Sequence, residues 1–420
     1  MRRVYSFLFY LALPLVMLRL WYRGRKAPAY RRRVAERLGQ VPVQPQGTLW
    51  VHAVSVGETI AAVPLVRALQ KRWPDLPVLV TTMTPTGSER VQALLGDAVQ
   101  HSYAPYDAPH LVNRFLGRVN PRALVIMETE LWPNMVTLTH RRGAPVFLVN
   151  ARLSERSARG YSRVLPLVRE MLQSLDWVAA QAQADADRFG KLGIPDSRID
   201  VTGSIKFDLT IADAMRQQAA DLRKRIGERP VWIAASTHRG EDAELLAAHR
   251  QVLRQYPGAL LILVPRHPER FAEVWEEAGT LGVPIGRRSV DDDPAKLSVY
   301  LADTMGELLM LFGVADVAFI GGSLVDHGGH NPLEPAAWGM PVIMGPSNFN
   351  FADVCQRLTE GEGLCYVGSA PVLANRLFAF FDDPEHRTAI GRNAQAVVDA
   401  NRGSLQRLVE GILSRMPDSP

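Results

Sequence analysis

The chain has 420 residues, of which 47% are apolar and 22% are charged, as in ordinary globular proteins. This length predicts two domains that each bury a core, and the composition excludes a disordered, collagen-like or multi-span membrane protein. Cys355 and Cys365 are the only cysteines. The chain therefore has no disulfide framework and no CxxC zinc site, which suits a reducing compartment.

The positive charge is concentrated at the amino terminus. Residues 1–40 hold ten basic residues against one acid, Glu36, a net charge of +9. The whole chain carries +5, which leaves −4 for residues 41–420. Such an acidic body is unusual for a duplex-binding enzyme, so we expect no nucleic-acid partner.

An uncharged stretch of 15 residues, Val4 to Leu18, lies between these basic residues. We expect it to stay in the protein as a membrane anchor, with the following arginines on the cytoplasmic side and attracted to anionic lipids. A signal peptide is one alternative, disfavoured by the basic charge after the apolar run and by the lack of a clear cleavage site. An amphipathic helix packed on the protein itself is the other.

Apolar runs that alternate with helix-length segments predict two similar halves. Strands are expected at 48–55, 77–83, 123–127, 146–150 and 177–181, and again at 231–236, 260–265, 298–302, 316–322 and 341–345. The fold class is therefore α/β, with parallel sheets and right-handed crossovers in both halves.

We expect two Rossmann-like domains that face each other across a cleft. The predicted boundaries are 1–40 for the anchor and basic arm, 41–210 for an N-terminal acceptor domain and 225–405 for a C-terminal nucleotide-sugar domain. Ligands of open α/β sheets bind beyond the carboxyl ends of the strands, so the loops there should carry the function.

Ser55 and Glu58 follow the first strand with the spacing of a capping box, in which both side chains only satisfy helix amides. Pro64 would then fall at the ninth helical position and kink or break the helix. We therefore expect the helix to begin at Ala61 or later, where Pro64 is tolerated. Glu58 would then be a loop carboxylate available for chemistry.

Two further acids, Glu128 and Glu130, follow the predicted strand 123–127. Acids in this position are commonly solvated, so the pattern alone is weak. It would indicate an acidic site if these side chains shared a sheet edge with Glu58.

Arg266 and His267 directly follow the predicted strand 260–265. An arginine there can clamp a phosphate through its planar fork of donors, and a histidine can add one more. An exposed basic loop is the alternative.

Two helix starts are predicted at Thr304–Glu307 and Asn331–Glu334, the second with Pro332 at its first helical position and glycines upstream. Free amides at a helix start, together with the helix dipole, can bind an anion. Glycine-rich turns are common, but together with these helix starts they predict an anion site.

Two other features are less informative. Asp326, His327 and His330 offer few ligands in a flexible turn, so we expect no metal there. Lys206 lies at the predicted domain junction, where it is either a solvated charge or a contact to an anionic substrate.

Together these features favour a membrane-held, two-domain enzyme with the layout of a sugar-nucleotide glycosyltransferase. The motifs HAVSVGE, TTMTPTGSERV, YAPYD, METELWPN, NARLSERS, VTGSIKFD, PRHPERF, DTMGELLMLF and GGHNPLEPAAWGMPVIMGP occur in this order. They resemble the 3-deoxy-D-manno-octulosonic acid (Kdo) transferase family of lipopolysaccharide assembly, from the N-terminal apolar segment to the last predicted helix.

The resemblance implies a GT-B fold, CMP-Kdo as donor and a tetraacylated lipid A precursor (lipid IVA) as acceptor at the cytoplasmic face of the inner membrane. It implies Glu58 as general base and places two other reaction-stabilising positions on Glu128 and Lys206. The implied CMP contacts are Pro265, Arg266, Met305, Gly306, Glu307, Asn331, Pro332, Leu333 and Glu334.

The chemistry fits these residue types. One carboxylate base suffices for an inverting displacement. CMP leaves with a single phosphate, which Arg266 and the helix start near Asn331 can hold without a metal. We expect no metal and no cofactor.

Two alternative functions stay open. Another GT-B enzyme could use a UDP-sugar, although two phosphates would require more donors. A non-catalytic, membrane-tethered scaffold would use the acids only as helix caps.

Overall fold

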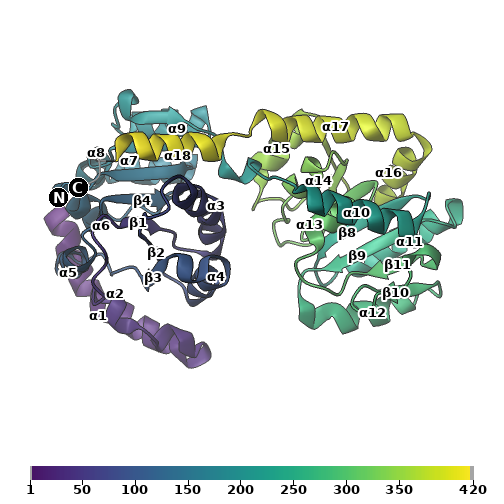
Figure 1. The fold of residues 1–420 in the computed structure, drawn as a ribbon, viewed down its shortest axis with the longest axis horizontal. Helices are drawn as coiled ribbons and strands as arrows, with labels where there is room; N and C mark the ends of the chain where they lie inside the picture. Colours follow the sequence, from purple (N-terminus) through teal and green to yellow (C-terminus); the bar gives the residue numbers. More distant parts are fainter. Residues whose placement is uncertain (1, 417–420) are drawn as a thin grey trace. The chain divides into compact units, whose positions relative to one another are not determined.

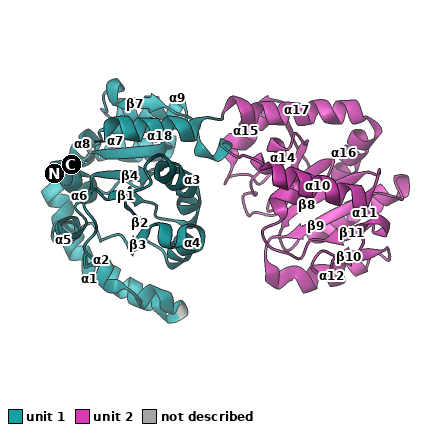
Figure 2. Cartoon of the chain, viewed as in Figure 1, with its two compact units in different colours: residues 1–208, 402–420 teal, residues 209–401 magenta. Residues whose placement is uncertain are grey.

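The computed structural model describes residues 2–416, which form two compact units (Figures 1 and 2). Unit 1 contains the described residues up to Asp208 and those from Arg402 onward, and unit 2 is Leu209–Asn401. Each unit contains one seven-stranded sheet in which every pair of neighbouring strands is parallel. The predicted α/β class is confirmed.

The sheet of unit 1 has the order β3-β2-β1-β4-β5-β6-β7. Its strands are β1 (Leu49–His52), β2 (Val78–Thr82), β3 (Gln100–Tyr103), β4 (Ala123–Met127), β5 (Val146–Ala151), β6 (Trp177–Ala180) and β7 (Ile199–Val201). In register, Leu49 of β1 lies between Val78 of β2 and Ala123 of β4.

The helices of unit 1 cover both faces of this sheet (Figure 1). They are α1 (Arg2–Lys26), α2 (Val34–Arg37), α3 (Val56–Arg72), α4 (Pro85–Leu95), α5 (Pro109–Val119), α6 (Pro133–Arg141), α7 (Glu155–Arg163), α8 (Leu165–Gln173), α9 (Gln183–Lys191) and α18 (Ser404–Arg415), with 3₁₀ turns η1 (Pro28–Arg31), η2 (Gly96–Ala98), η3 (Asp196–Arg198) and η4 (Ile205–Phe207).

Strand β1 illustrates why the central strands read as continuous apolar runs. Leu49 and Val51 pack in the core that contains α3, α4 and α18, whereas Trp50 between them packs on Phe115 of α5. Successive side chains of a strand point to opposite faces, so a sheet covered on both sides needs apolar residues at every position.

The sheet of unit 2 has the order β10-β11-β9-β8-β12-β13-β14. Its strands are β8 (Val231–Thr237), β9 (Leu260–Pro265), β10 (Ile285–Arg287), β11 (Val299–Leu301), β12 (Val317–Ile320), β13 (Val342–Met344) and β14 (Leu364–Tyr366). The helices are α10 (Asp213–Ile226), α11 (Asp242–Gln255), α12 (Phe271–Gly279), α13 (Leu308–Phe312), α14 (Leu333–Ala337), α15 (Ala352–Glu360), α16 (Ala370–Asp382) and α17 (Pro384–Ala400), with 3₁₀ turns η5 (Pro268–Arg270) and η6 (Pro294–Lys296).

The carboxyl-terminal helix α18 belongs to unit 1, although the chain reaches it through unit 2. Its start is capped by Asp208, whose two carboxylate oxygens accept hydrogen bonds from the backbone N–H groups of Gly403 and Leu405, both at 2.6 Å. Gly411 lets the helix approach the ring of Trp177, because a Cβ there would lie 2.2 Å from a ring carbon.

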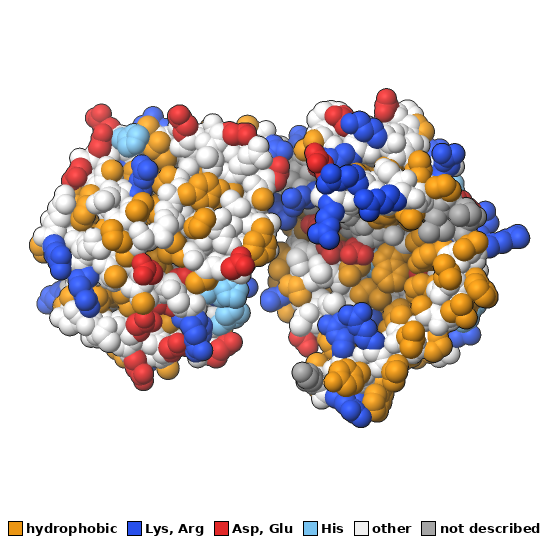
Figure 3. Space-filling view, turned by 180° about the vertical axis from the view of Figure 1, so that it is seen from behind, with side chains coloured by type: hydrophobic (Ala, Val, Ile, Leu, Met, Phe, Trp, Pro, Cys, Tyr) orange, Lys and Arg blue, Asp and Glu red, His pale blue; other side chains and the backbone are white. Residues whose placement is uncertain are grey.

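Helix α1 is long and apolar enough to cross a membrane, with a mean hydropathy of 1.7 over its most apolar window. One face packs on unit 1 through Phe9, Leu13 and neighbouring residues. Another face is exposed, and Leu11 and Leu15 retain 61% and 68% of their accessible surface. In the space-filling view, apolar side chains gather along this edge of unit 1 (Figure 3).

Candidate functional site

The predicted catalytic acids of unit 1, Glu58 and Glu128, lie where the strand order of its sheet reverses. Strands β1 and β4 are neighbours, and the chain winds outward from them in opposite directions. Open α/β sheets bind ligands at this position, beyond the carboxyl ends of the strands. Glu58 follows β1 and Glu128 follows β4, so both predicted residues are at this edge.

The predicted start of the helix after β1 is wrong. Helix α3 begins at Val56 with Ser55 as its N-cap, and Pro64 lies inside the helix. The capping box explains the early start: Glu58 N–H donates to Ser55 Oγ (3.4 Å), and the Glu58 carboxylate accepts from Val54 N–H (2.8 Å) and from Ser55 Oγ (2.7 Å). These hydrogen bonds outweigh the missing N–H of Pro64, so Glu58 is a helical residue and not a loop residue.

The Glu58 carboxylate can act as a base although it caps the helix. Its side chain is 8% exposed, and burial raises its pKa to about 6 despite the two capping hydrogen bonds. The negative charges of Glu130 and Glu128 contribute a small part of this rise. The three carboxylates therefore interact, as a shared sheet edge requires.

Glu128 adopts the left-handed conformation (φ 58°) immediately after β4. This conformation costs energy for a residue with a Cβ, and such strain concentrates at functional sites. Its backbone N–H still donates to Val149 of β5 (2.9 Å), so the strand pairing continues up to this residue. The conformation turns the chain away from the sheet at the acidic edge.

Lys206 is carried by η4, which lies over the end of β5. Asn150, also left-handed (φ 52°), is fully buried, and its Oδ1 accepts from the backbone N–H of Ile205 at 3.1 Å. Gln181 donates to the carbonyl of Asn150 (2.8 Å). These contacts fix η4, and with it the backbone of Lys206, to the sheet of unit 1.

An apolar hollow of about 330 Å³ adjoins this acidic edge. It is lined by Tyr5, Phe9, Leu131, Trp132, Pro133, Tyr161, Val168 and Met171, contributed by α1, the β4–α6 segment, α7 and α8. Trp132 donates through Nε1 to Glu130 (3.2 Å), which connects the hollow to the acidic loop.

In unit 2 the strand order reverses between β8 and β12. Pro265 is the last residue of the neighbouring strand β9, and Arg266 follows it, exposed, with its backbone N–H bound to Thr237 O (3.1 Å). Arg266 lies close enough to Glu334 to lower the pKa of that carboxyl, whereas burial, the larger effect, raises it. The structure therefore brings Arg266 and the Asn331–Glu334 segment together.

Both predicted helix starts in unit 2 differ from expectation. Helix α13 begins at Leu308, after the predicted Thr304–Glu307 segment. Helix α14 begins at Leu333, with Asn331 Oδ1 accepting from Leu333 N–H (3.1 Å) and Asn331 Nδ2 donating to Glu334 (3.1 Å), so Pro332 precedes the first helical residue. Helices α13 and α14 have only five residues each. The dipole of so short a helix is small, which weakens the predicted anion site at these starts.

The Met305–Glu307 segment follows β11, the other neighbour of β9. Met305 and Gly306 are exposed, and Gly306 has φ +90°. Glu307 is held by Arg288, which donates to both carboxylate oxygens at 2.9 and 3.2 Å, and this contact lowers the pKa of Glu307.

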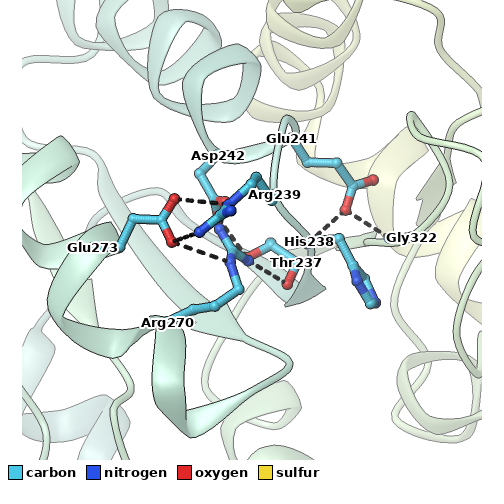
Figure 4. Close-up of polar contacts among 8 residues, drawn as sticks. All are labelled: Thr237, His238, Arg239, Glu241, Asp242, Arg270, Glu273 and Gly322. Carbon is cyan, nitrogen blue, oxygen red and sulfur yellow. Dashed lines mark hydrogen bonds and ion pairs between the residues drawn. The ribbon is translucent and has the colours of Figure 1, made fainter.

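The glycine-rich loop after β12 is bound by a carboxylate that sequence reasoning missed. Glu241 is fully buried and accepts from the backbone N–H groups of Gly322 (2.7 Å), Ser323 (3.0 Å) and Leu324 (2.9 Å). It also accepts from His238 N–H (2.9 Å), and Figure 4 shows it between His238 and Gly322. The amides that glycines could offer to a phosphate are thus occupied from within the protein.

The β8–α11 loop is braced by a second buried pair. Arg270 forms an ion pair with Asp242 and donates to Thr237 O (2.9 Å), and Thr237 Oγ1 donates to Asp242 (2.6 Å) (Figure 4). The roles of Glu241 and Asp242 could not be predicted from the sequence, because only the fold shows that both carboxylates are buried. Together with Glu241 this pair fixes His238 at the sheet edge.

Within residues 2–416, no group of three or more His, Cys, Asp or Glu side chains is arranged to hold a metal ion. Among the histidines at the unit 2 sheet edge, the ring of His238 stacks on that of His327, and a hydrogen bond of 2.8 Å joins His238 Nε2 to His330 Nε2.

Comparisons with known proteins agree with this architecture. A family model described as 3-Deoxy-D-manno-octulosonic-acid transferase (kdotransferase) matches residues 32–209. The 3-deoxy-D-manno-octulosonic acid transferase of Haemophilus influenzae is 43% identical over 97% of both chains, and that of Bordetella pertussis is 36% identical over 95% of this chain and 96% of the relative.

Solved structures support the fold. UDP-GlcNAc 2-epimerase from Neisseria meningitidis, bound to UDP-GlcNAc, superimposes with a TM-score of 0.59 and 14% identity, covering 88% of this chain and 100% of that one. At this identity the likeness concerns the fold alone, two Rossmann-like units of the GT-B class. Given the sequence relatives, the chain belongs to the Kdo transferase family and is a glycosyltransferase.

Proposed function

We propose that the protein transfers Kdo from CMP-Kdo to a sugar hydroxyl of a tetraacylated lipid A precursor, with inversion at the anomeric carbon and Glu58 as general base. The observation that carries the proposal is the Glu58 carboxylate at the β1–β4 edge, whose pKa burial raises to about 6. A base works best when its pKa lies near the working pH.

In the proposed step the acceptor oxygen forms a bond to the anomeric carbon of Kdo as the bond from that carbon to the phosphate oxygen breaks. The bonding electron pair leaves with CMP, and the hydroxyl proton passes to Glu58. Glu128 and Lys206 would stabilise the reacting groups from the same unit. Arg266 would neutralise charge on the leaving phosphate, so the step requires no metal.

We assign the donor to unit 2 and the acceptor to unit 1. Pro265, Arg266, Met305–Glu307 and Asn331–Glu334 all lie at the carboxyl edge of the unit 2 sheet, which supports a nucleotide site there. The apolar hollow beside Glu130 supports a lipid acceptor in unit 1, because an acyl chain needs an apolar surface next to the reacting sugar.

We further propose that α1 holds the protein at the cytoplasmic face of the inner membrane. Its exposed apolar face can enter a bilayer, and the exposed arginines that follow it can bind anionic headgroups; these are Arg19, Arg23, Arg25, Arg31 and Arg32. Replacing both Leu11 and Leu15 by glutamate should abolish co-sedimentation with anionic vesicles. The matched control replaces Val290 and Val372, exposed apolar residues of unit 2, by glutamate and should leave sedimentation unchanged.

Mass analysis of the product formed from CMP-Kdo and purified lipid IVA tests the reaction. We expect a mass increase by whole Kdo residues, and NMR of the new linkage should show inversion. If the mass of lipid IVA stays unchanged although CMP-Kdo binds, the assignment of lipid IVA as acceptor is refuted. Thermal protection by UDP and not by CMP would refute the donor and favour a UDP-sugar enzyme.

A further inference from the structure

Four histidines form a cluster at the carboxyl edge of the unit 2 sheet. They are His238 after β8, His267 after β9, and His327 and His330 after β12, hereafter the histidine cluster. The three strands are consecutive in the order β9-β8-β12, and the winding reverses between β8 and β12. The cluster therefore occupies the position where this fold binds ligands.

His238 is the centre of the histidine cluster. Its ring stacks on that of His327, with centroids 4.4 Å apart, and meets the edge of His267 at 5.4 Å. The ring of His330 is parallel to it within 5°, with centroids 5.0 Å apart, and the two rings meet end to end through their Nε2 atoms. His238 Nε2 and His330 Nε2 are 2.8 Å apart. One of these nitrogens must donate and the other accept, so the pair shares one hydrogen.

The His238–His330 pair is neutral in the free protein at pH 7. Burial, and to a smaller extent the neighbouring basic groups, lowers the pKa of each ring to about 4. The charged and titratable groups around the pair are Arg266, His267 and Arg270 on the β9–α12 segment, Asp326, His327 and Glu334 on the β12–α14 segment, and Glu241 and Asp242 on the β8–α11 segment.

Three of these charges are already compensated within the protein. Asp242 pairs with Arg270, and Glu241 accepts four backbone N–H groups. Arg266 is exposed beside the pair. An anion bound next to Arg266 would reverse the local field, because its negative charge favours the protonated form of an imidazole.

Backbone donors are scarce at this edge. The amides of Gly322, Ser323 and Leu324 are bound by Glu241, and helices α13 and α14 have five residues each. A phosphate at this edge thus depends on side-chain donors. Protonation of the pair would supply a cation and an added N–H donor while keeping the hydrogen bond between the rings.

We propose that the histidine cluster binds the phosphate of the donor nucleotide together with Arg266 and takes up one proton on the His238–His330 pair as the nucleotide binds. This inference rests on the proposed donor. The proton comes from solvent and returns to it when the nucleotide leaves. Glu241 acts as a positioning residue, since it fixes the backbone of His238 against the loop that carries His330.

Calorimetric titration of the full chain in detergent with the methyl ester of CMP tests the proposal. This probe carries one fixed negative charge, as the donor phosphate does, whereas the second ionisation of CMP itself has a pKa of about 6 and would obscure the result. If binding returns the pair to an ordinary pKa of about 6.5 from about 4, affinity should rise about tenfold between pH 7.5 and 5.5.

Substitutions of His238 and His330 test whether this pair causes the pH dependence of affinity. His238→Gln and His330→Gln should each reduce the pH effect to less than about threefold, and His386→Gln, an exposed histidine on α17, should retain it in full. Glu334 also has a raised pKa and faces Arg266. If it caused the effect, both pair variants would keep the tenfold change, which would overturn the proposal.

The wild-type protein gives a separate test that needs no variant. Titrations at pH 5.5 in two buffers of different ionisation enthalpy should show uptake of close to one proton per nucleotide bound. Binding without proton uptake, and with equal affinity at both pH values, would overturn the histidine inference and leave the donor assignment intact. Failure of CMP and its ester to bind at any pH would overturn both.

Discussion

Replacing Glu58 by glutamine removes the titrating group of the capping box while keeping its shape. In wild type the folded-state pKa of Glu58 is about 6, above the ordinary value of 4.5. A carboxyl with a raised folded pKa stabilises the fold when protonated, below pH 4.5, and this stabilisation is lost as the pH rises through 6. Glutamine does not titrate and can still accept a capping hydrogen bond.

The size of the effect follows from the two pKa values. Between pH 5 and pH 8 the wild-type free energy of unfolding should fall by about 1.3 kcal/mol relative to the Glu58→Gln variant. The side chain is only 8% exposed, so solvent screening reduces this little. At neutral pH the protein thus keeps a charge that destabilises it, as expected where function requires a carboxylate.

Hydrogen exchange of peptides from β1 and α3 measures this difference. Exchange resolves unit 1 from unit 2, which matters because two units can unfold separately. Comparing the variant with wild type at each pH cancels the intrinsic exchange rates. If the difference in unfolding free energy were the same at pH 5 and pH 8, Glu58 would have an ordinary pKa, and the reasoning from its burial would be refuted.

Two other substitutions test the packing that positions the sites. Asp242→Asn should cost about 3–5 kcal/mol in urea unfolding because it leaves the buried guanidinium of Arg270 without its charged partner, and a cost below 1 kcal/mol would contradict the ion pair. Gly411→Ala should destabilise unit 1 by about 1–3 kcal/mol because the added Cβ would overlap the Trp177 ring, whereas Gly160→Ala, on the open surface of α7, should stabilise it by about 0.5–1 kcal/mol. Equal effects of the two glycine substitutions would show that α18 does not pack as described.

The central strands were predictable and the outer strands were not. Each of the ten predicted runs overlaps a strand of the structure, because a strand covered on both faces must be apolar throughout. The four strands missing from the prediction are β3, β7, β10 and β14, which are the two outer strands of each sheet. The outer strands are partly exposed: β3 begins with the polar residues Gln100 and His101, and β14, although apolar, has only three residues.

The sequence motifs predict which residues belong to the candidate site, but not how these residues are held in the structure. The sequence shows both a capping box and Pro64, but not that the three capping hydrogen bonds start the helix at Val56 in spite of the proline. Glu241 and His238 gave no signal because their role depends on a loop some 80 residues away in the chain, bound through backbone amides. Such contacts leave no trace in residue spacing.

The rate of a single round of Kdo transfer by the Glu58→Gln variant tests the central claim most directly. With CMP-Kdo and lipid IVA at saturating concentrations, we predict a rate about 10²–10⁴ times below wild type, the usual contribution of a general base, with unchanged affinity for CMP. The exposed Glu89→Gln variant on α4 should transfer at the wild-type rate. Transfer by the Glu58→Gln variant within a few-fold of wild type would contradict the role of Glu58 as base.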